Sequence, residues 1–560
     1  MAEGKRERLV DVPVLVVGGG PVGLGLAIEL GLRRIPVTLI EMRDGSVSVP
    51  KMSQVHARTL EFCRRWGIVD RVFDAGFPKH HPQDFVYCTS VLGREISRVK
   101  TPSYNEKPTD DPASPVRDYQ CPQLYFDPIL QDFARTIPDI TLGYFTRLDS
   151  FTEEEDRVVA DVTDMQSGAP RTISARYLVG CDGAQSLVRT RLGIGMGGAG
   201  RLDLSVSIFF RSAALGTMHD KGWGRFYRVN DETGCWAELV AINGKDLWRL
   251  AILSGLDADK PFDADACLRR AVGGPFPYEM ISVLHWDRTE FVADSFRKGR
   301  VFIAGDAAHQ NSPTGGLGMN TGFADATNLG WKLAALIEGW GGEALLASYE
   351  TERRPIAMRN AAECSRLFRD AVTLPGDKAL AEESPAGEAA RQRYRDVLQH
   401  NVKAGTVSVT EQMKLGFCYE ESPVIAADGT PPEPTTGRYK PSTRPGTRAP
   451  HGWLADGRSV LDLYGESFTL LRLGPSAPDA APLLAAAQAR GVPMQAVAIG
   501  EANIVALYER RLVLVRPDGH IAWRGDALPA DPLALVDQVR GAAPADRAAA
   551  RSRLAQQAGD

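Results

Sequence analysis

An apolar strand that runs straight into a glycine-rich turn constrains this chain more than any other feature. Residues 12–41 read VPVLVVGGGPVGLGLAIELGLRRIPVTLIE, and Gly18, Gly20 and Gly23 lie between that strand and a predicted helix. Glycines at this spacing let the backbone approach a pyrophosphate, whose charge the helix N-terminus stabilises. Glu41 ends the next strand, close to the ~20 positions expected for an acid that accepts hydrogen bonds from an adenosine ribose. The segment therefore predicts a βαβ dinucleotide-binding unit.

Two later segments also place an Asp at the end of a predicted strand. In YLVGCDGAQSLVRTRLGI, Asp182 follows one strand and precedes a helix, and in GDAAHQNSPTGGLGMN, Asp306 follows the apolar run 301–304. The Pro and the glycines of the second segment precede a helix N-terminus, a combination that brings backbone close to a large polar ligand. Because the three segments are far apart in the chain, we expect them to converge on one cofactor larger than a mononucleotide.

The segment GIGMGGAG matches the same glycine pattern at Gly195, Gly197 and Gly200. No core strand leads into it and no βαβ unit follows it, so we interpret it as a flexible loop. A single nucleotide-binding unit is therefore expected.

Composition narrows the classes of partner. With 560 residues we expect about two to four domains, and a formal charge of −5 argues against a broad nucleic-acid footprint. No apolar run approaches the ~20 residues needed to span a bilayer, and the N-terminus lacks a signal-peptide pattern, so a cytoplasmic protein is expected. The eight cysteines are scattered, which predicts reduced thiols and no metal site.

Three motifs together make residues 10–370 similar to a known family: GGGPVG with Glu41, CDGAQSLVR, and GDAAHQNSPTGGLGMNTGFADATNLGWKL. The chain resembles the single-component (class A) FAD-dependent aromatic hydroxylases of the p-hydroxybenzoate and phenol hydroxylase type. The resemblance implies an extended FAD, with adenosine at Glu41, pyrophosphate at the glycine turn and ribityl chain at Asp306. The isoalloxazine ring would lie against residues 313–319, where the following helix N-terminus stabilises negative charge on the flavin. The residues that the resemblance assigns to FAD are Gly18, Gly20, Gly23, Glu41, Lys51, Arg58, Gln123, Asp182, Asp306, Pro313, Gly318, Met319 and Asn320.

The resemblance also implies the reaction, which is hydroxylation of a phenolic aromatic substrate with NADPH or NADH and O2 through a flavin hydroperoxide. A base beside the substrate hydroxyl would help, and relatives place an acid near Asp118, for which a solvated loop residue is the alternative. The carbonyl of Pro313 is expected to orient the substrate hydroxyl, whereas we interpret His309 as a structural histidine beside the flavin. Lys51 stands where many relatives have arginine, and its contact with the cofactor is still expected.

The segments between the motifs predict a substrate-binding sheet. Runs at 204–210, 234–242 and 247–253 are apolar or alternating and are separated by Asn-Asp and Asn-Gly turn signals, as in antiparallel strands. Aromatic residues here would form a wall for a planar apolar substrate, and core packing is the alternative for each of them. Together with Pro313, the residues assigned to the substrate are Trp223, Tyr227 and Trp236.

The composition changes after about residue 370. An Ala/Glu-rich stretch and a Pro/Thr/Gly-rich linker lead to an α/β pattern that resembles the thioredoxin-like domain appended to phenol hydroxylase. No cysteine follows Cys418, so this domain cannot perform dithiol chemistry, and packing or a homodimer contact is its expected role.

The predicted fold is α/β, with a Rossmann-like FAD-binding domain, an inserted and mainly antiparallel substrate domain, and a C-terminal thioredoxin-like domain. The expected boundaries are 1–75 with 111–200 and 286–370 for the FAD-binding domain, 76–110 with 201–285 for the substrate domain, 371–440 for a helical segment and linker, 441–545 for the C-terminal domain and 546–560 for a frayed tail.

Three other functions stay open on the sequence. A flavin halogenase and an alkene epoxidase share the fold, but the W-x-W-x-I-P signature of halogenases is absent and no membrane-anchoring helix of the epoxidase kind is visible. The third is a protein that binds FAD only to dock or stabilise a partner. Substrate-dependent oxidation of NAD(P)H separates an enzyme from such a binder.

Overall fold

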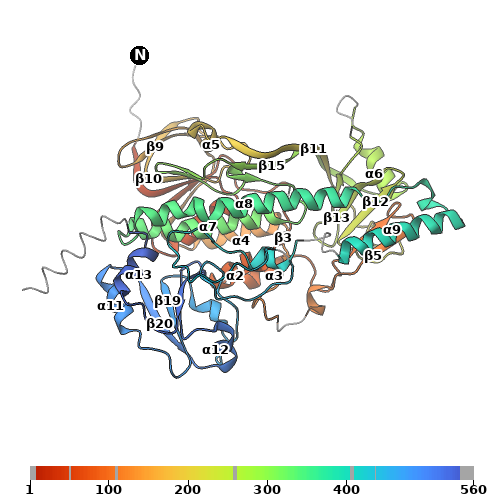
Figure 1. The fold of residues 1–560 in the computed structure, drawn as a ribbon. Coiled ribbons are helices and arrows are strands. Elements are labelled where there is room, and N and C mark those ends of the chain that lie inside the picture. Colours follow the sequence, from red (N-terminus) through yellow and green to blue (C-terminus); the bar gives the residue numbers. More distant parts are fainter. Residues whose placement is uncertain are drawn as a thin grey trace, which may run out of the picture.

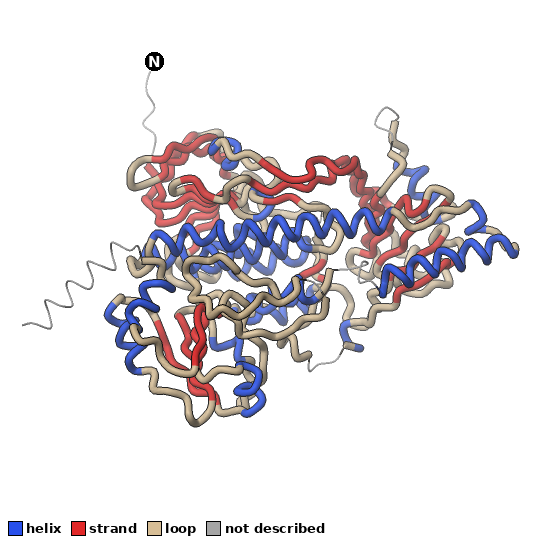
Figure 2. The backbone as a smooth tube through the Cα atoms, viewed as in Figure 1, coloured by secondary structure: helices blue, strands red, loops and turns tan. Residues whose placement is uncertain are grey.

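The computed structural model describes residues 8–49, 52–107, 111–256, 261–403, 409–435 and 437–542, with side chains from residue 12 on. Its strands gather in two eight-stranded sheets and a smaller C-terminal sheet, with long helices between them (Figures 1 and 2). This arrangement confirms the predicted α/β class. No helix in the described part of the chain is both long and apolar enough to cross a membrane.

The first sheet is built around β1 (Arg8–Val17), the strand that leads into the glycine turn. β1 pairs in parallel with β10 (Pro170–Gly180) on one side and with β2 (Val37–Ile40) on the other. Residues 14–17 are almost fully buried, as expected for a parallel strand covered on both faces. The outer strands are β7 (Ile140–Gly143), β8 (Thr146–Glu153), β9 (Val158–Asp164), β16 (Arg297–Lys298) and β17 (Val301–Ile303).

The two helices that follow the ligand motifs pack on each other near their N-termini. α1 (Pro21–Gly31) follows the glycine turn and α7 (Leu317–Ile337) follows the second motif. A Cβ at Gly322 of α7 would lie 2.7 Å from Cγ2 of Val22 in α1, so glycine permits this contact. The sequence motifs that were predicted to converge therefore lie side by side.

α8 (Glu343–Val372) crosses the molecule from the first sheet to the second (Figure 1). It packs beside α7 and carries residues that contact both sheets. The other helices of the first 415 residues are α2 (Ala57–Arg65), α3 (Val69–Ala75), α4 (Gln123–Arg135), α5 (Leu187–Leu192), α6 (Ala264–Val272), α9 (Pro385–Lys403) and α10 (Glu411–Leu415).

The second sheet is mainly antiparallel, as predicted, and only β12 and β4 pair in parallel. α6 covers one face of this sheet, and the other face turns toward α8 and the loop before α7. A separate two-stranded ladder joins β3 (Gln54–Val55) to β6 (Tyr119–Gln120). In spatial order the strands of the second sheet are β18 (His309–Gln310), β15 (Glu279–Ala293), β11 (Met196–Arg211), β14 (Leu247–Ile252), β13 (Gly234–Ala241), β12 (Phe226–Asp231), β4 (Phe85–Cys88) and β5 (Glu95–Val99).

The GIGMGGAG segment is a strand rather than the expected flexible loop. Residues from Met196 onward belong to β11 and pair with β15, for example Gly197 with Val292. Register shifts interrupt the pairing around Gly198 and Gly200, whose φ values of +129° and +83° favour glycine. The glycines thus serve irregular pairing in a long strand.

The C-terminal sheet has the order β20-β19-β21-β22 and packs between helices. Its strands are β19 (Phe468–Leu473), β20 (Met494–Ile499), β21 (Leu512–Val515) and β22 (Ile521–Gly525), and its helices are α11 (Ala481–Ala489), α12 (Ala502–Tyr508) and α13 (Pro532–Val539). The predicted tail from residue 546 lies outside the described residues, and the domain boundaries stay a prediction.

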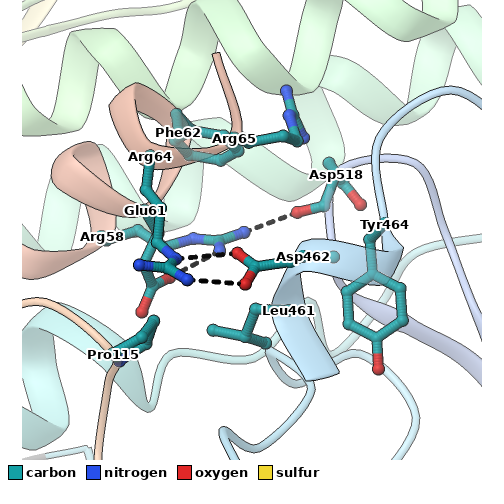
Figure 3. Close-up of a pocket in the computed structure, with 11 residues that line it drawn as sticks. Arg58, Glu61, Phe62, Arg64, Arg65, Pro115, Leu461, Asp462, Tyr464 and Asp518 are labelled. Carbon is teal, nitrogen blue, oxygen red and sulfur yellow. Dashed lines mark hydrogen bonds and ion pairs between the residues drawn. The ribbon is translucent and has the colours of Figure 1, made fainter. Parts of the chain in front are cut away.

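Ion pairs join α2 of the first part of the chain to the C-terminal domain (Figure 3). Arg64 donates two hydrogen bonds to Asp462, at 2.9 and 2.8 Å. Arg58 donates to the carbonyl oxygen of Asp518 at 2.5 Å. The cavity between these groups has a volume of about 20 Å³, so it can hold water but no organic ligand.

Candidate functional site

The glycine turn between β1 and α1 packs tightly against the end of β10. Gly18 has a φ of +113°, and a Cβ there would lie 2.3 Å from the carbonyl oxygen of Cys181. A Cβ at Gly23 would lie 2.0 Å from the carbonyl oxygen of Gly18. No atom lies within 4 Å of a Cβ at Gly20, and no side chain caps α1. An anionic group can therefore approach the first N–H groups of α1, as the pyrophosphate prediction requires.

Glu41 lies beside this turn, where the sequence predicted it. One carboxylate oxygen accepts a hydrogen bond from the backbone N–H of Gly19 at 2.9 Å, and the other accepts from Arg43 N–H at 3.0 Å. These bonds fix the carboxylate and leave part of its acceptor capacity unused. The geometry suits a ribose diol placed next to the glycine turn.

A buried carboxyl that sequence reasoning missed lies at the start of α4. Gln123 donates to one oxygen of Asp127 at 2.9 Å. The other oxygen of Asp127 and the hydroxyl of Tyr144 are buried and have no hydrogen-bond partner among the described residues. Burial raises the pKa of Asp127 to about 7. Orphaned buried polar atoms are rare in proteins, so they suit a site that a polar cofactor completes.

The two Asp residues at strand ends have different surroundings. Asp182 accepts from Ser186 Oγ at 2.6 Å and from the backbone N–H of Val188 at 3.1 Å, so its carboxylate is used to cap α5. Asp306 is exposed within an otherwise buried run from Val301 to His309. Of the two, Asp306 has the exposed side chain, and the cofactor contacts of both residues stay predictions.

Two glycines with positive φ values shape the loop before α7. Gly315 and Gly316 have φ values of +88° and +66°, and Gly316 caps α7 without a side-chain hydrogen bond. Pro313 is exposed, and its carbonyl accepts from Gly316 N–H at 3.1 Å. A carbonyl oxygen has two lone pairs, so Pro313 can accept a second hydrogen bond. Gly318 and Met319, in the first turn of α7, keep partial exposure.

Asn320 ties this loop to the β3–α2 connection. Its side-chain oxygen accepts from the N–H of His56 at 2.9 Å and from Thr59 Oγ1 at 2.8 Å. Its amide donates to the carbonyls of Gln54 and Gly316, at 3.0 and 2.8 Å. The side chain is thus fully used in shaping the loop, and any cofactor contact must come from its backbone.

Lys51 and Arg58 were also predicted to contact the cofactor. Lys51 lies outside the described residues. Arg58 bonds Glu61, at 2.9 Å, and the carbonyl oxygen of Asp518 in the C-terminal domain (Figure 3). The structure corrects the assignment of Arg58 to the cofactor, because the helix α2 places this side chain at the domain interface.

Asp118 is held in an ion pair that the sequence did not reveal. One oxygen accepts from the N–H of Ala57 at 2.8 Å, and the other accepts from Lys414 Nζ at 2.6 Å. Burial opposes ionisation, but the Lys414 ammonium prevails and holds the pKa of Asp118 well below its usual range. A carboxylate with a depressed pKa is a weak base, so these contacts favour a positioning role.

His56 is a second missed residue at the same place. It is buried, and its Nε2 has no hydrogen-bond partner among the described residues. A Cβ at Gly316 would lie 3.7 Å from this nitrogen, so the ring is directed toward the loop before α7. Burial lowers the pKa of His56 to about 4, and the ring is therefore neutral at physiological pH.

His309 makes the contacts of a structural histidine. Its Nε2 lies 2.7 Å from Asp325, which also accepts from Arg353 at 2.8 Å. All three side chains are buried. These contacts support the interpretation made from the sequence.

The aromatic residues assigned to the substrate lie on the wrong face of the second sheet. Trp223, Tyr227 and Trp236 pack in the core cluster that α6 closes. Trp223 stacks on Trp248 with ring centroids 5.8 Å apart. Cys235, the neighbour of Trp236 in β13, packs on the opposite side of the sheet with Phe368 of α8. The structure corrects the three assignments in favour of core packing.

The opposite face, directed at the loop before α7, carries arginines instead. Arg288 donates to Ser312 Oγ at 2.9 Å, one residue before Pro313. Arg225 donates to Ser53 Oγ at 2.6 Å, and Ser53 precedes β3. Arg249 lies next to Trp248 in β14 and so belongs to this face. The sequence could have indicated this face, because arginines occur inside apolar strands, as in LWRLAI.

Family models match both parts of the chain. The model described as FAD binding domain matches residues 11–363, and the one described as aromatic-ring hydroxylase, C-terminal, matches residues 442–543. Tetracenomycin B2 monooxygenase-dioxygenase of Streptomyces olivaceus is 32% identical, over 95% of this chain and 98% of its own length. Phenol 2-monooxygenase of Pseudomonas sp. (strain EST1001) is 31% identical, over 95% and 93%.

Solved structures match over nearly the whole chain. RebC soaked with chromopyrrolic acid, with bound 7-carboxy-K252c, is 38% identical with a TM-score of 0.89, covering 95% of this chain and 100% of that one. Aklavinone-11 hydroxylase in a ternary complex with FAD and aklavinone is 28% identical with a TM-score of 0.79, covering 95% and 99%.

Proposed function

Because this chain belongs to the family of FAD-dependent aromatic-ring monooxygenases, we propose that it hydroxylates a phenolic ring with NAD(P)H as electron donor and O2 as oxygen source. Three of the relatives are named for phenol, 4-methyl-5-nitrocatechol and aklavinone as substrates. The shared element of these substrates is a hydroxylated aromatic ring, which is the class proposed for this chain.

The described residues fit FAD. The open N-terminus of α1 would hold the pyrophosphate, Glu41 would accept from the adenosine ribose, and Asp306 would face the sugar-alcohol chain. When bound, the flavin takes a hydride from NAD(P)H and activates O2 for transfer of one oxygen atom to the ring. The uncapped N-terminus of α7 stabilises negative charge placed next to it.

The proposal rests mainly on the contact between the loop before α7, residues 312–316, and the second sheet. We call this segment the flavin loop. Ser312 bonds Arg288 of β15, while Asn320 ties the same loop to β3. An aromatic substrate between this sheet and the flavin would have the Pro313 carbonyl beside its hydroxyl. That carbonyl accepts a hydrogen bond, orients the phenol and leaves the ring carbon toward the cofactor.

Product analysis with labelled dioxygen tests the proposal. The holoenzyme, NAD(P)H and a set of phenols are expected to yield a product that carries one atom from ¹⁸O2. A halogenase would need halide for turnover, and an epoxidase would oxidise an alkene rather than a ring. If no phenol acquires labelled oxygen while FAD binds normally, the hydroxylase proposal fails and a binding-only role is favoured.

The first prediction concerns Glu41. Glu41→Ala is expected to weaken FAD binding about 10- to 100-fold, because hydrogen bonds to a charged group contribute roughly 1.5–3 kcal/mol. Glu41→Gln keeps a neutral acceptor and should lose less. Asp44→Ala, a nearby exposed carboxylate that bonds Ser46, is the matched control. The measurement is FAD affinity by fluorescence titration of the apoprotein, and an unchanged affinity of Glu41→Ala would refute the ribose assignment.

The second prediction separates two roles of Asp118. Because Lys414 keeps this carboxylate ionised, we expect Asp118→Asn to leave the pH profile of hydroxylation unshifted. Its folded pKa is depressed, so its contribution to stability is present above about pH 4 and is lost as pH falls further. Transient kinetics across pH provide the test. Hydroxylation that falls with normal flavin reduction and gains a new pH dependence would restore Asp118 as the phenol base.

A further inference from the structure

A cavity lies outside the ligand motifs, where α8 and α10 meet the segments 416–420 and 439–448. Its volume is about 190 Å³. An apolar cavity of about 150 Å³ in another protein holds benzene, so this one has room for an aromatic ring with a small substituent. None of the described residues that line it belongs to the glycine turn, the flavin loop or the second sheet. Glu420 and Lys440 of the lining are exposed, so a ligand can enter from solvent.

The walls of the cavity are largely apolar. Ile356 of α8 and Leu415 at the end of α10 line it together with Phe417 and Tyr439. All four side chains are buried. A ring that enters the cavity leaves water for these walls and can pack against two aromatic side chains. The shape and polarity of the cavity therefore suit a ligand with an apolar body of the size of one ring.

One arginine of the cavity has no counter-charge. Arg359 of α8 donates to the carbonyl oxygen of Met413 and to the side chain of the next residue, each at 2.9 Å, and it forms no ion pair among the described residues. Burial lowers its pKa to about 10. Glu363, the acid that acts on it, is paired with Arg366 instead, at 2.6 Å. A largely buried guanidinium without a carboxylate favours an anionic ligand group.

The other cationic side chains of the cavity are already neutralised. Each of them bonds a carboxylate within the described part of the chain. The pairs are Arg444 with Glu420, Lys440 with Glu433 and Arg448 with Glu61, at 2.8, 3.0 and 3.0 Å. One negative charge on the ligand is therefore enough to balance the cavity.

α10 lies between the cavity and the flavin loop. Leu415 lines the cavity, whereas Met413 packs against Leu317, the first residue of α7. A Cβ at Gly315 of the flavin loop would lie 2.6 Å from Cγ2 of Val409, two residues before α10. A ligand in the cavity would thus contact the helix whose other side packs against the flavin loop.

We propose that the cavity is an effector site for a single-ring aromatic monoanion of the benzoate class, which bonds Arg359 and fixes α10 against the flavin loop. This ligand is distinct from the ring that is hydroxylated, and its site is separate from the substrate position. A guanidinium matches a carboxylate in bidentate geometry, and the apolar walls would hold the ring.

Matched acid and amide probes test the proposal on the wild-type holoenzyme. 4-Fluorobenzoate and 4-fluorobenzamide have nearly the same shape but differ in charge, and titration followed by fluorine NMR measures the affinity of each. The acid is expected to bind about 10- to 100-fold more tightly than the amide, as for hydrogen bonds to a charged group. No saturable binding of the acid, or equal affinities of the two probes, would overturn the proposal.

Substitutions in α8 locate the bound acid. Arg359→Gln is expected to reduce the acid-over-amide ratio about tenfold or more, whereas a merely structural role of Arg359 would weaken both probes alike. Ile356→Trp fills the cavity and should remove binding of both probes. Arg354→Gln is the matched control, because Arg354 is a half-buried arginine of the same helix that donates to the carbonyl of Ala293, at 2.9 Å, outside the cavity. If the acid binds Arg359→Gln and Ile356→Trp as it binds the wild type, it occupies another site and the proposal fails.

Hydrogen exchange tests the effect on α10. At ten times the Kd, 4-fluorobenzoate is expected to slow amide exchange in residues 409–416 about tenfold in the wild type and to leave it unchanged in Ile356→Trp. Binding without slower exchange there would refute the effector role. FAD content and thermal unfolding verify the fold of each variant, and the wild-type comparisons carry the test if a variant does not fold. Because no readout is oxygen transfer, failure of this inference leaves the monooxygenase proposal intact, and failure of that proposal leaves this test valid.

Discussion

Glu352→Gln is expected to lower the free energy of unfolding by about 3–5 kcal/mol, because it leaves buried cations without their carboxylate. Glu352 lies in α8 and accepts two hydrogen bonds from Arg516 of the C-terminal domain, at 2.7 and 2.9 Å. It also accepts from Lys332, at 2.7 Å, and from Ser422, at 2.6 Å. Asp518 would remain beside Arg516, but Lys332 would lose its only carboxylate partner in the described part of the chain.

Chemical denaturation measures this effect, with Glu350→Gln as the control. Glu350 lies in the same helix and accepts from Ser295 Oγ and Phe296 N–H rather than from a cation, at 2.6 and 2.9 Å. Both donors bond the same carboxylate oxygen, and a glutamine oxygen can accept from both, so the control should lose about 1–2 kcal/mol at most. Equal losses in the two variants would show that the charge of Glu352 contributes nothing beyond its hydrogen bonds.

The pH dependence of this difference has a definite sign. Burial opposes ionisation of Glu352, but Arg516 and Lys332 hold its pKa well below the usual range. A depressed carboxyl pKa contributes stability above the unfolded value, about 4.3, and that contribution is lost as pH falls below it. The difference between the wild type and Glu352→Gln is therefore expected to shrink in acid.

Local patterns were sufficient to predict the βαβ segment at which we propose that the adenosine end of FAD binds. The glycine turn and Glu41 belong to one short βαβ segment, and their contact follows from backbone geometry that such a segment always adopts. The strand before Asp306 and the helix after Pro313 were recognisable for the same reason. Family resemblance then supplied the cofactor, which the family models confirm.

The substrate side could not be predicted in the same way. β12, β13 and β14 are largely buried on both faces, so the alternation of polar and apolar residues that marks a core face is weak there. The sequence therefore gave no indication of which face of the sheet would contact the substrate, and the aromatic face was the wrong prediction. Arg249 was a better marker, because a charged residue inside a buried strand needs a partner.

Contacts between segments that are far apart in the sequence could not be predicted either. Asp118 and Lys414 are 296 positions apart, and the linker that brings α10 to β6 has no strong local pattern. Arg58 was assigned to the cofactor by family resemblance, but its side chain bonds the C-terminal domain. In both cases a tertiary partner, absent from the local sequence, decides the role of the charge.

A suitable hydroxylated aromatic compound is expected to accelerate flavin reduction by NAD(P)H about 100-fold, which corresponds to about 2.7 kcal/mol of barrier. The loop from Ser312 to Gly316 contacts the second sheet through Arg288 and precedes the N-terminus of α7, beside which we propose that the flavin lies. A substrate bound there touches the same loop and can shift the flavin between two positions, a change that needs only a few hydrogen bonds.

The advantage of such gating is that reduced flavin without substrate would consume O2 and NAD(P)H and release hydrogen peroxide. Anaerobic stopped-flow reduction across a panel of phenols and hydroxy acids measures the acceleration, and an aromatic compound without a hydroxyl is the control ligand. The control should bind less tightly and accelerate less, because it cannot bond the Pro313 carbonyl. If every compound that perturbs the flavin spectrum leaves the reduction rate unchanged, substrate and reductant act independently. The loop then positions the ring for oxygen transfer without controlling when the flavin is reduced.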